Sequence, residues 1–297
     1  MNYRNARLLV VLACGVVAVS FAAIFIRLSN AKPLAISFYR MFFATLALSP
    51  IVLLSSKKRK EFGKIKGKTV WLIVASGVAL GLHFGAWVTS LDHTSVASSV
   101  VLVTTQPLFI VALEFLFFRK KPGRGLSLGM IAAVAGSAMI GLGDMHGGEM
   151  QLYGDLLALA GALFAATYLM LGRKVRQKIA TFPYIFLVYG ISSLFLFALC
   201  LQQGVDLITY SGKNWLLFAL LALIPTLIGH TSFNWALSEV KASRVGATIL
   251  GEPIGASILA AIIFDEIPNP LSMAGGLLVL SAIYYIWKKR KPKTLDS

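Results

Sequence analysis

The sequence predicts an all-α membrane protein in which ten transmembrane helices form two inverted five-helix repeats, with both termini in the cytoplasm. Three observations predict this fold class. Hydrophobic residues make up 57% of the chain and charged residues only 13%, and the mean hydropathy is +0.78. One soluble core cannot bury so much apolar surface. Apolar runs of about twenty residues recur along the chain, and its two halves resemble each other.

The ten expected spans occupy most of the sequence, and the loops between them are short. Each span is long enough to cross about 30 Å of hydrocarbon. The first lacks the short form and the A-x-A-like cleavage site of a signal peptide, so we interpret it as a helix. In chain order the spans are 7–27, 35–55, 69–90, 95–118, 125–143, 153–172, 181–201, 213–237, 242–264 and 269–287.

The repeat is visible when the chain is aligned with itself, without gaps, at an offset of 146 residues. Residues 87–129 then fall on residues 233–275, and six of the identical pairs are Leu91 with Leu237, Pro107 with Pro253, Leu113 with Leu259, Phe118 with Phe264, Pro122 with Pro268, and Gly129 with Gly275. Five spans per half is an odd number, so the second half must enter the membrane in the opposite orientation. We therefore divide the chain into residues 1–148 and 149–297.

Basic residues predict the topology. The net charge is +16, and all 28 Lys and Arg residues except Arg27, Lys32, Arg40 and Lys213 fall on one side of the membrane when the N-terminus is cytoplasmic. This bias indicates a multi-pass protein of the cell membrane with both termini inside. The basic loops are expected to meet anionic lipid headgroups rather than nucleic acid.

Two prolines interrupt corresponding spans. Pro107 and Pro253 each lie near the middle of an apolar segment, and the preceding residues are Gln106 and Glu252. Proline lacks an N–H and leaves a carbonyl free one turn earlier, which only a cavity or another protein group can accommodate in a membrane. Broken helices in both halves are typical of a transporter's substrate site. We expect hinges there, beside a midplane cavity between the third, fourth, eighth and ninth spans, helped by the first and sixth; simple kinks are the alternative.

Two charged residues lie well inside spans. Glu252 is the deepest acidic residue, and a carboxylate at that depth is usually functional because its insertion is unfavourable. It can carry a coupling proton, pair with a substrate ammonium group, or serve as a structural carboxyl bonded to a neighbouring helix. Arg40 can bind a substrate carboxylate, extend to the outer headgroups, or anchor a helix end.

Histidines and their polar neighbours form a second candidate group. His83 and His230 lie a few residues from the expected midplane in paired spans. His230 shares a helical face with Asn234, and Thr248 shares one with Glu252, because both pairs are four residues apart. Together they predict a polar track, although a lone histidine in a membrane is also common as a structural group.

Aromatic residues complete the candidate site. Trp87 lies near a span end, where the interfacial belt of aromatic residues explains it; alternatively it caps a cavity for an aromatic or cationic ligand. Tyr39 and Tyr168 are weaker candidates. Gly77, Gly81 and Gly85 recur at four-residue spacing and predict close helix packing, within the bundle or in a dimer.

Three segments resemble the EamA-type ten-helix members of the drug/metabolite transporter superfamily. They are PLAISFYRMFFATLAL at 33–48, QPLFIVALEFLFFRKKP at 106–122, and GEPIGASILAAIIFDEIPNPLSMAGGLLVLSAIYYI at 251–286. The resemblance covers nearly the whole chain. It implies a small carrier that works by alternating access around a central cavity, commonly as an exporter of amino acids or other metabolites and sometimes of toxic amines.

The expected function is secondary transport of small metabolites across the cytoplasmic membrane, most simply amino acids or related compounds, with export as the expected direction. Efflux of lipophilic or quaternary cations is the alternative, and a channel or a non-transport membrane protein is the alternative from another class. The sequence has no G-x-S-x-G or H-E-x-x-H motif and no Cys/His metal spacing. We therefore expect no enzyme activity, no metal and no cofactor other than a coupling proton. The expected partners are membrane lipid and a small-molecule substrate, with the chain a monomer or a homodimer.

Overall fold

The structure is a computed structural model that describes residues 3–94, 96–119, 123–143, 149–265 and 270–288. Every regular element in these ranges is a helix. The elements are α1 (Tyr3–Arg27), α2 (Pro33–Leu53), α3 (Ser56–Lys60), η1 (Glu61–Lys64), α4 (Lys68–Ser90), α5 (Val96–Val103), α6 (Gln106–Phe118), α7 (Arg124–Gly143), α8 (Glu149–Arg176), α9 (Thr181–Gln202), α10 (Gly212–Leu221), η2 (Ala222–His230), α11 (Thr231–Ala236), α12 (Ala242–Ile249), α13 (Glu252–Phe264) and α14 (Pro270–Lys288).

Within the described residues, eight stretches are long and apolar enough to cross a membrane. They are Asn5–Arg27, Pro33–Leu53, Lys68–Ser90, Ser98–Phe117, Gln151–Arg176, Thr181–Gln202, Gly212–Ala236 and Ala242–Phe264. Each corresponds to one predicted span. The fifth and tenth predicted spans contain the shorter apolar stretches Arg124–Met139 and Met273–Ile286. The all-helical membrane fold is therefore confirmed, whereas the count of ten spans and the side on which the termini lie stay predictions.

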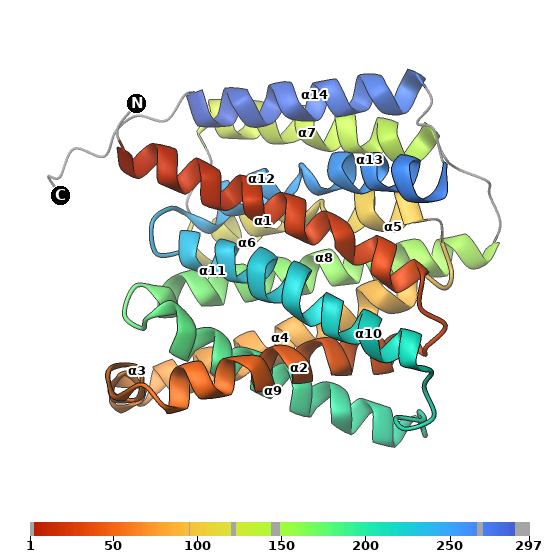
Figure 1. Cartoon of the computed structure of the whole chain (residues 1–297). Helices are drawn as coiled ribbons and strands as arrows, with labels where there is room; N and C mark the ends of the chain where they lie inside the picture. Colours follow the sequence, from red (N-terminus) through yellow and green to blue (C-terminus); the bar gives the residue numbers. More distant parts are fainter. Residues whose placement is uncertain (1–2, 95, 120–122, 144–148, 266–269, 289–297) are drawn as a thin grey trace, which may run out of the picture.

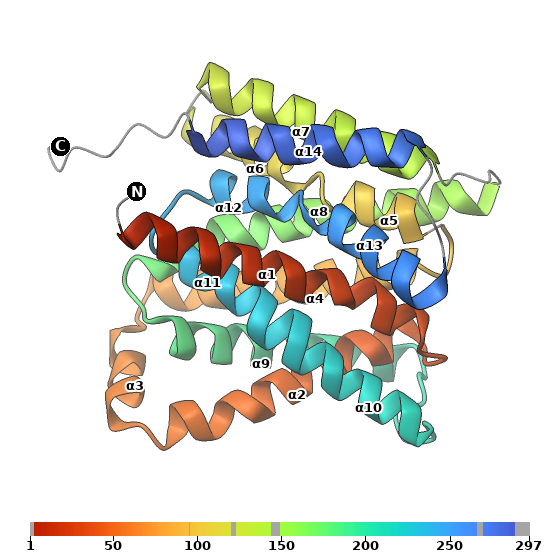
Figure 2. The same cartoon turned by 45° about the horizontal axis from the view of Figure 1, so that its top comes forward.

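The helices form a bundle in which segments from the two halves of the chain lie side by side (Figure 1). α2 packs against α9, α4 packs against α8 and α9, and α1 packs against η2 and α13. The pair α7 and α14 lies along one side of this bundle (Figure 2). Helix faces approach closely at small residues: a Cβ on Gly77 would lie 2.6 Å from a side-chain atom of Ile191 in α9. This glycine therefore serves packing within the bundle.

Two of the membrane helices are interrupted at their centres. α5 ends at Val103 and α6 begins at Gln106, while α12 ends at Ile249 and α13 begins at Glu252. Proline lies in the first turn of α6 and of α13, where a missing N–H costs no helical hydrogen bond. At the first break, the hydroxyl groups of Thr104 and Thr105 donate to carbonyls at the end of α5, namely those of Val100 (2.8 Å), Val101 (2.9 Å) and Leu102 (2.6 Å).

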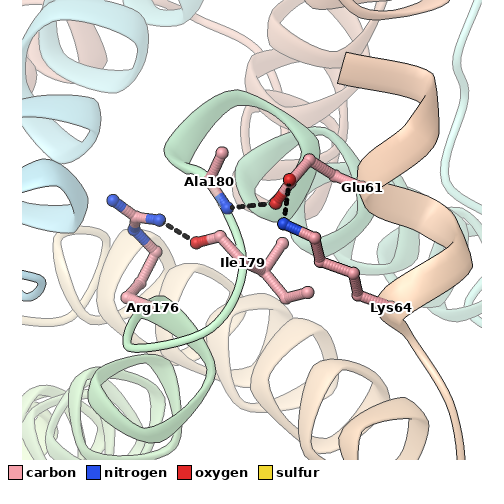
Figure 3. A network of polar contacts seen from close by, with 5 residues as sticks. All are labelled: Glu61, Lys64, Arg176, Ile179 and Ala180. Atoms are coloured by element: carbon pink, nitrogen blue, oxygen red, sulfur yellow. Dashed lines mark hydrogen bonds and ion pairs between the residues drawn. The ribbon is translucent and has the colours of Figure 1, made fainter. Parts of the chain in front are cut away.

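The connector between α2 and α4 docks onto the turn between α8 and α9 (Figure 3). Its residue Glu61 accepts a hydrogen bond from the backbone N–H of Ala180 at 3.0 Å and another from Lys64. The hydrogen bond from Lys64, and to a smaller extent that from Ala180, lowers the pKa of Glu61 below its ordinary value. Arg176, the last residue of α8, donates to the carbonyl of Ile179 in that turn. The connector thereby joins the first half of the chain to the second.

Candidate functional site

A cavity lies where the interrupted helices meet the centre of the bundle. Its wall receives side chains from α1, α2, α4, the α5–α6 break, α8, η2, α11, α12 and α13. Seven residues selected from the sequence line it: Arg40, His83, Trp87, Gln106, Tyr168, His230 and Glu252. The other lining residues are Val19, Ala22, Val103, Thr104, Ala165, Leu169, Phe233 and Ile249. The spans expected around the cavity did not include the second, although Arg40 was itself a candidate; the structure places Arg40 of α2 on the wall.

The lining residues correspond between the two halves of the chain. Ten of the fifteen form pairs at the offset of 146 residues, so equivalent positions of both halves face one cavity. The pairs are Val19 with Ala165, Ala22 with Tyr168, Trp87 with Phe233, Val103 with Ile249, and Gln106 with Glu252. Arg40, His83, Thr104, Leu169 and His230 have no such counterpart on the wall. Most of the polar residues on the wall are therefore unpaired between the halves, whereas most of the apolar ones are paired.

Arg40 is completely buried, with 0% of its surface exposed. Its Nε donates to Thr226 Oγ1 at 2.7 Å, and its guanidinium lies 4.0 Å above the ring of Phe84. The two terminal nitrogens, Nη1 and Nη2, have no hydrogen-bond partner among the residues that the structure describes. The extension to the outer headgroups considered from the sequence is thus wrong, because the side chain ends in the centre of the bundle.

Glu252 opens α13 and is 8% exposed. Its backbone carbonyl accepts a hydrogen bond from Ser20 of α1 at 3.4 Å. No ion pair joins the Glu252 carboxylate to Arg40 within the described ranges, although both side chains line the same cavity. The cavity therefore carries one basic and one acidic side chain that are not in direct contact.

His83, Trp87 and His230 form an aromatic part of the wall. The ring of His83 lies parallel to that of Trp87, with centroids 6.1 Å apart, and 6.3 Å from that of His230. His83 Nδ1–H donates to the carbonyl of Gly161 at 3.0 Å. Trp87 is only 3% exposed, and its indole N–H has no partner among the described residues. The interfacial belt therefore does not account for Trp87.

Five other candidates do not line the cavity. Tyr39 stacks on Phe218 and donates to the carbonyl of Leu207. Asn234 donates to Tyr168 and to the carbonyl of His230 (2.8 Å), so it supports two lining residues from behind. Thr248 donates to the carbonyl of Arg244 at 3.1 Å. Pro107 and Pro253 lie in the first turns of α6 and α13, beside the breaks.

Sequence reasoning missed two residues that hold Arg40, namely Thr226 and Phe84. Thr226 lies in η2, a π-helical segment that contains Pro225. The available signal was Pro225, because a proline inside an apolar span disturbs the regular helix. The π-helical turns that accompany such irregularities are frequent at functional sites. Phe84 gave no signal, since an aromatic residue in a membrane helix is ordinary. Among the described residues, no group of three or more His, Cys, Asp or Glu side chains is placed to hold a metal ion.

Curated relatives with similar sequences are transporters by name. An uncharacterized transporter of Archaeoglobus fulgidus is 22% identical over 90% of this chain and 91% of its own length. The uncharacterized transporter YwfM of Bacillus subtilis is 26% identical, over 90% and 89%. The pseudopaline exporter CntI of Pseudomonas aeruginosa is 22% identical, over 74% and 76%.

The fold and the family agree with these similarities. A crystal structure of another protein superposes with a TM-score of 0.75 and 16% identity, covering 94% of this chain and 96% of that one, which shows a common fold. Residues 5–142 and 152–288 match the profile of the EamA-like transporter family. Since that match covers both halves of the sequence, the chain belongs to the EamA-like transporter family and is a membrane transporter.

Proposed function

We propose that the protein is a secondary transporter that exports small metabolites, in the first place amino acids and related compounds, by alternating access. The observation that carries this proposal is the cavity at the two helix breaks, which holds Arg40 and Glu252 together. A zwitterion offers each of these groups its opposite charge. A lipophilic or quaternary cation would suit Glu252 but would meet an uncompensated Arg40, so the cavity favours the amino-acid class.

An inverted repeat gives alternating access a structural basis. The paired lining positions support the idea that two equivalent units, residues 1–148 and 149–297, enclose one site. Packing supports it too: the contact of α4 with α8 has its counterpart in the contact of η2 with α1, at positions shifted by one repeat. In this proposal α7 and α14 complete ten spans, and the breaks beside Pro107 and Pro253 act as hinges while one unit rocks against the other.

The charge distribution supports a placement in the cell membrane with both termini in the cytoplasm. Export then means movement away from the basic loops. Glu252 is the group proposed to carry a coupling proton, because it is the acidic residue on the cavity wall. Small-molecule substrate and membrane lipid are the proposed partners, with the chain acting as a monomer or a homodimer.

Counterflow in proteoliposomes tests the proposal. Purified protein is reconstituted with an unlabelled compound inside, and uptake of the labelled compound is followed for amino acids, amines, quaternary cations and small sugars. Saturable counterflow of amino acids supports the proposal. Counterflow restricted to quaternary cations would overturn the substrate class, and flux that does not saturate would indicate a channel.

A further inference from the structure

The side chain of Arg40 is held in one orientation by two neighbours from other helices. Thr226 Oγ1 accepts the hydrogen bond from Arg40 Nε at 2.7 Å and donates its own hydrogen to the carbonyl of Leu221 at 2.8 Å. The donation to Leu221 leaves a lone pair of the hydroxyl for Nε. The ring of Phe84 supports the flat guanidinium from below at 4.0 Å. One edge of the guanidinium is thus engaged and one face is covered.

The remaining edge of the guanidinium is available to a ligand. Nη1 and Nη2 are buried and have no hydrogen-bond partner among the described residues. Leaving a buried charged donor without a partner is strongly unfavourable. Both nitrogens can donate only, and their fixed fork matches the two oxygens of a carboxylate. The chemistry that satisfies them is therefore an anion with two coplanar oxygens.

The π-helical segment explains why Thr226 is in a position to do this. In an α-helix a threonine hydroxyl bonds to the carbonyl four residues earlier, as Thr45 does to Met41 at 2.8 Å. Thr226, which lies in η2, instead bonds to the carbonyl five residues earlier, that of Leu221. In the same segment Pro225 cannot donate a backbone N–H. The wider turn of η2 thereby presents this hydroxyl to α2.

We propose that Arg40 Nη1 and Nη2 form a carboxylate-binding subsite of the cavity, and that Thr226 is the positioning residue that orients them. This inference rests on the proposed transport function and gives its substrate a required group, a free carboxylate. Glu252 on the same wall accommodates a positive group of that substrate. An α-amino acid has both groups, whereas its amide retains the ammonium and lacks the anion.

The decisive comparison is between amino acids and their amides, with leucine, phenylalanine, lysine and glutamine as probes. Binding is measured as the ligand-dependent rise in melting temperature of the full chain in detergent, and converted into an apparent affinity. In the unaltered protein, at least one acid is expected to bind about tenfold or more tightly than its amide, as is usual for a hydrogen bond to a charged group. No preference for any acid would overturn the subsite.

Variants separate positioning from general packing. Thr226→Val keeps the shape but removes the acceptor, and is expected to abolish the preference for the acid while binding of the amide is unchanged. Thr226→Ser restores the acceptor and should restore the preference. Thr45→Val removes a threonine hydroxyl that bonds only within α2 and should change neither. A Thr226→Val protein that weakens acid and amide equally would reduce Thr226 to a packing residue and overturn its assigned role.

Flux distinguishes a failure of the subsite from a failure of the proposed function. Counterflow of the amides at the rate of the acids would overturn the carboxylate subsite while leaving a carrier. Binding that prefers acids without counterflow of any of them would support the subsite and overturn the proposed transport of amino acids.

Discussion

The rings of His83 and Trp87 lie parallel within 6° on the cavity wall, with centroids 6.1 Å apart. His83 is also held by the Gly161 carbonyl at 3.0 Å, so α8 and Trp87 together determine the orientation of the imidazole. The indole covers one face of that ring and presents an N–H without a partner among the described residues. Trp87 therefore both shapes the cavity and orients its neighbour.

Replacing Trp87 should weaken substrate binding as well as folding, because Trp87 is buried and also lines the cavity. Trp87→Phe retains an aromatic face but loses the N–H, whereas Trp87→Ala loses both. An aromatic pair contributes about 0.5–1.5 kcal/mol beyond burial, so we expect the apparent KM of counterflow to rise by about twofold to tenfold in Trp87→Ala. Trp71→Ala is the control, because Trp71 is 75% exposed on the outside of the bundle. An unchanged KM in Trp87→Ala would show that the substrate binds elsewhere.

Glu252→Gln should remove the dependence of transport on the proton gradient while the protein stays folded. Glutamine has nearly the same shape, and the corresponding position of the first half already carries Gln106. The measurement is counterflow and gradient-driven flux at several pH values. Asp206→Asn, in an exposed loop, serves as the matched control. Gradient-driven flux that responds to pH as before would assign the coupling ion to another group.

Gly136→Ala should destabilise the pair formed by α7 and α14. The added Cβ would lie 2.6 Å from the backbone oxygen of Gly275 and 3.0 Å from the backbone nitrogen of Val279, so the helices would have to separate. Overpacking of this kind costs about 1–3 kcal/mol, and the melting temperature should fall. Gly63→Ala meets no atom within 4 Å and should leave it unchanged. Equal melting temperatures for both variants would mean that this contact does not limit stability.

Glu61→Gln should remove a small pH-dependent contribution to stability. The pKa of Glu61 is lowered in the folded protein, chiefly by its hydrogen bond from Lys64. The unfolded chain therefore binds the proton more readily, and this stabilisation is present above the ordinary pKa of 4.5 and is lost as the pH falls below it. Because the partner Lys64 is 57% exposed, the contribution is about 1 kcal/mol or less.

Melting curves recorded above and below that pH check the Glu61 prediction. The unaltered protein should lose more stability on acidification than Glu61→Gln does. Lys66→Gln, in the same connector, is the control, because it alters the charge of the loop without touching the Glu61 contacts. Parallel curves for the unaltered protein and Glu61→Gln would show that the docking of the connector does not depend on this carboxylate.

Much of the membrane fold could be predicted from the sequence. The apolar run at 35–55 became α2, Pro33–Leu53, because a lipid-facing segment must satisfy its backbone within one helix. The breaks beside Pro107 and Pro253 were also foreseeable, because both prolines lie near the middle of an apolar span and at corresponding positions of the two halves. The fifth and tenth spans stay predictions, because their apolar stretches are short in the described residues.

Hydropathy and the repeat thus determined which segments are helices, which two are interrupted and which positions correspond. These properties depend on local backbone chemistry and on residue order. Only the tertiary structure decided that the Arg40 side chain ends beside Thr226 and Phe84. It also decided that Trp87 lines the cavity, and that Asn234 does not line it but bonds to Tyr168, which does. Those contacts join helices that are distant in sequence. They depend on how each helix is rotated about its own axis, and a hydropathy pattern does not specify that rotation when the helix is apolar on all sides.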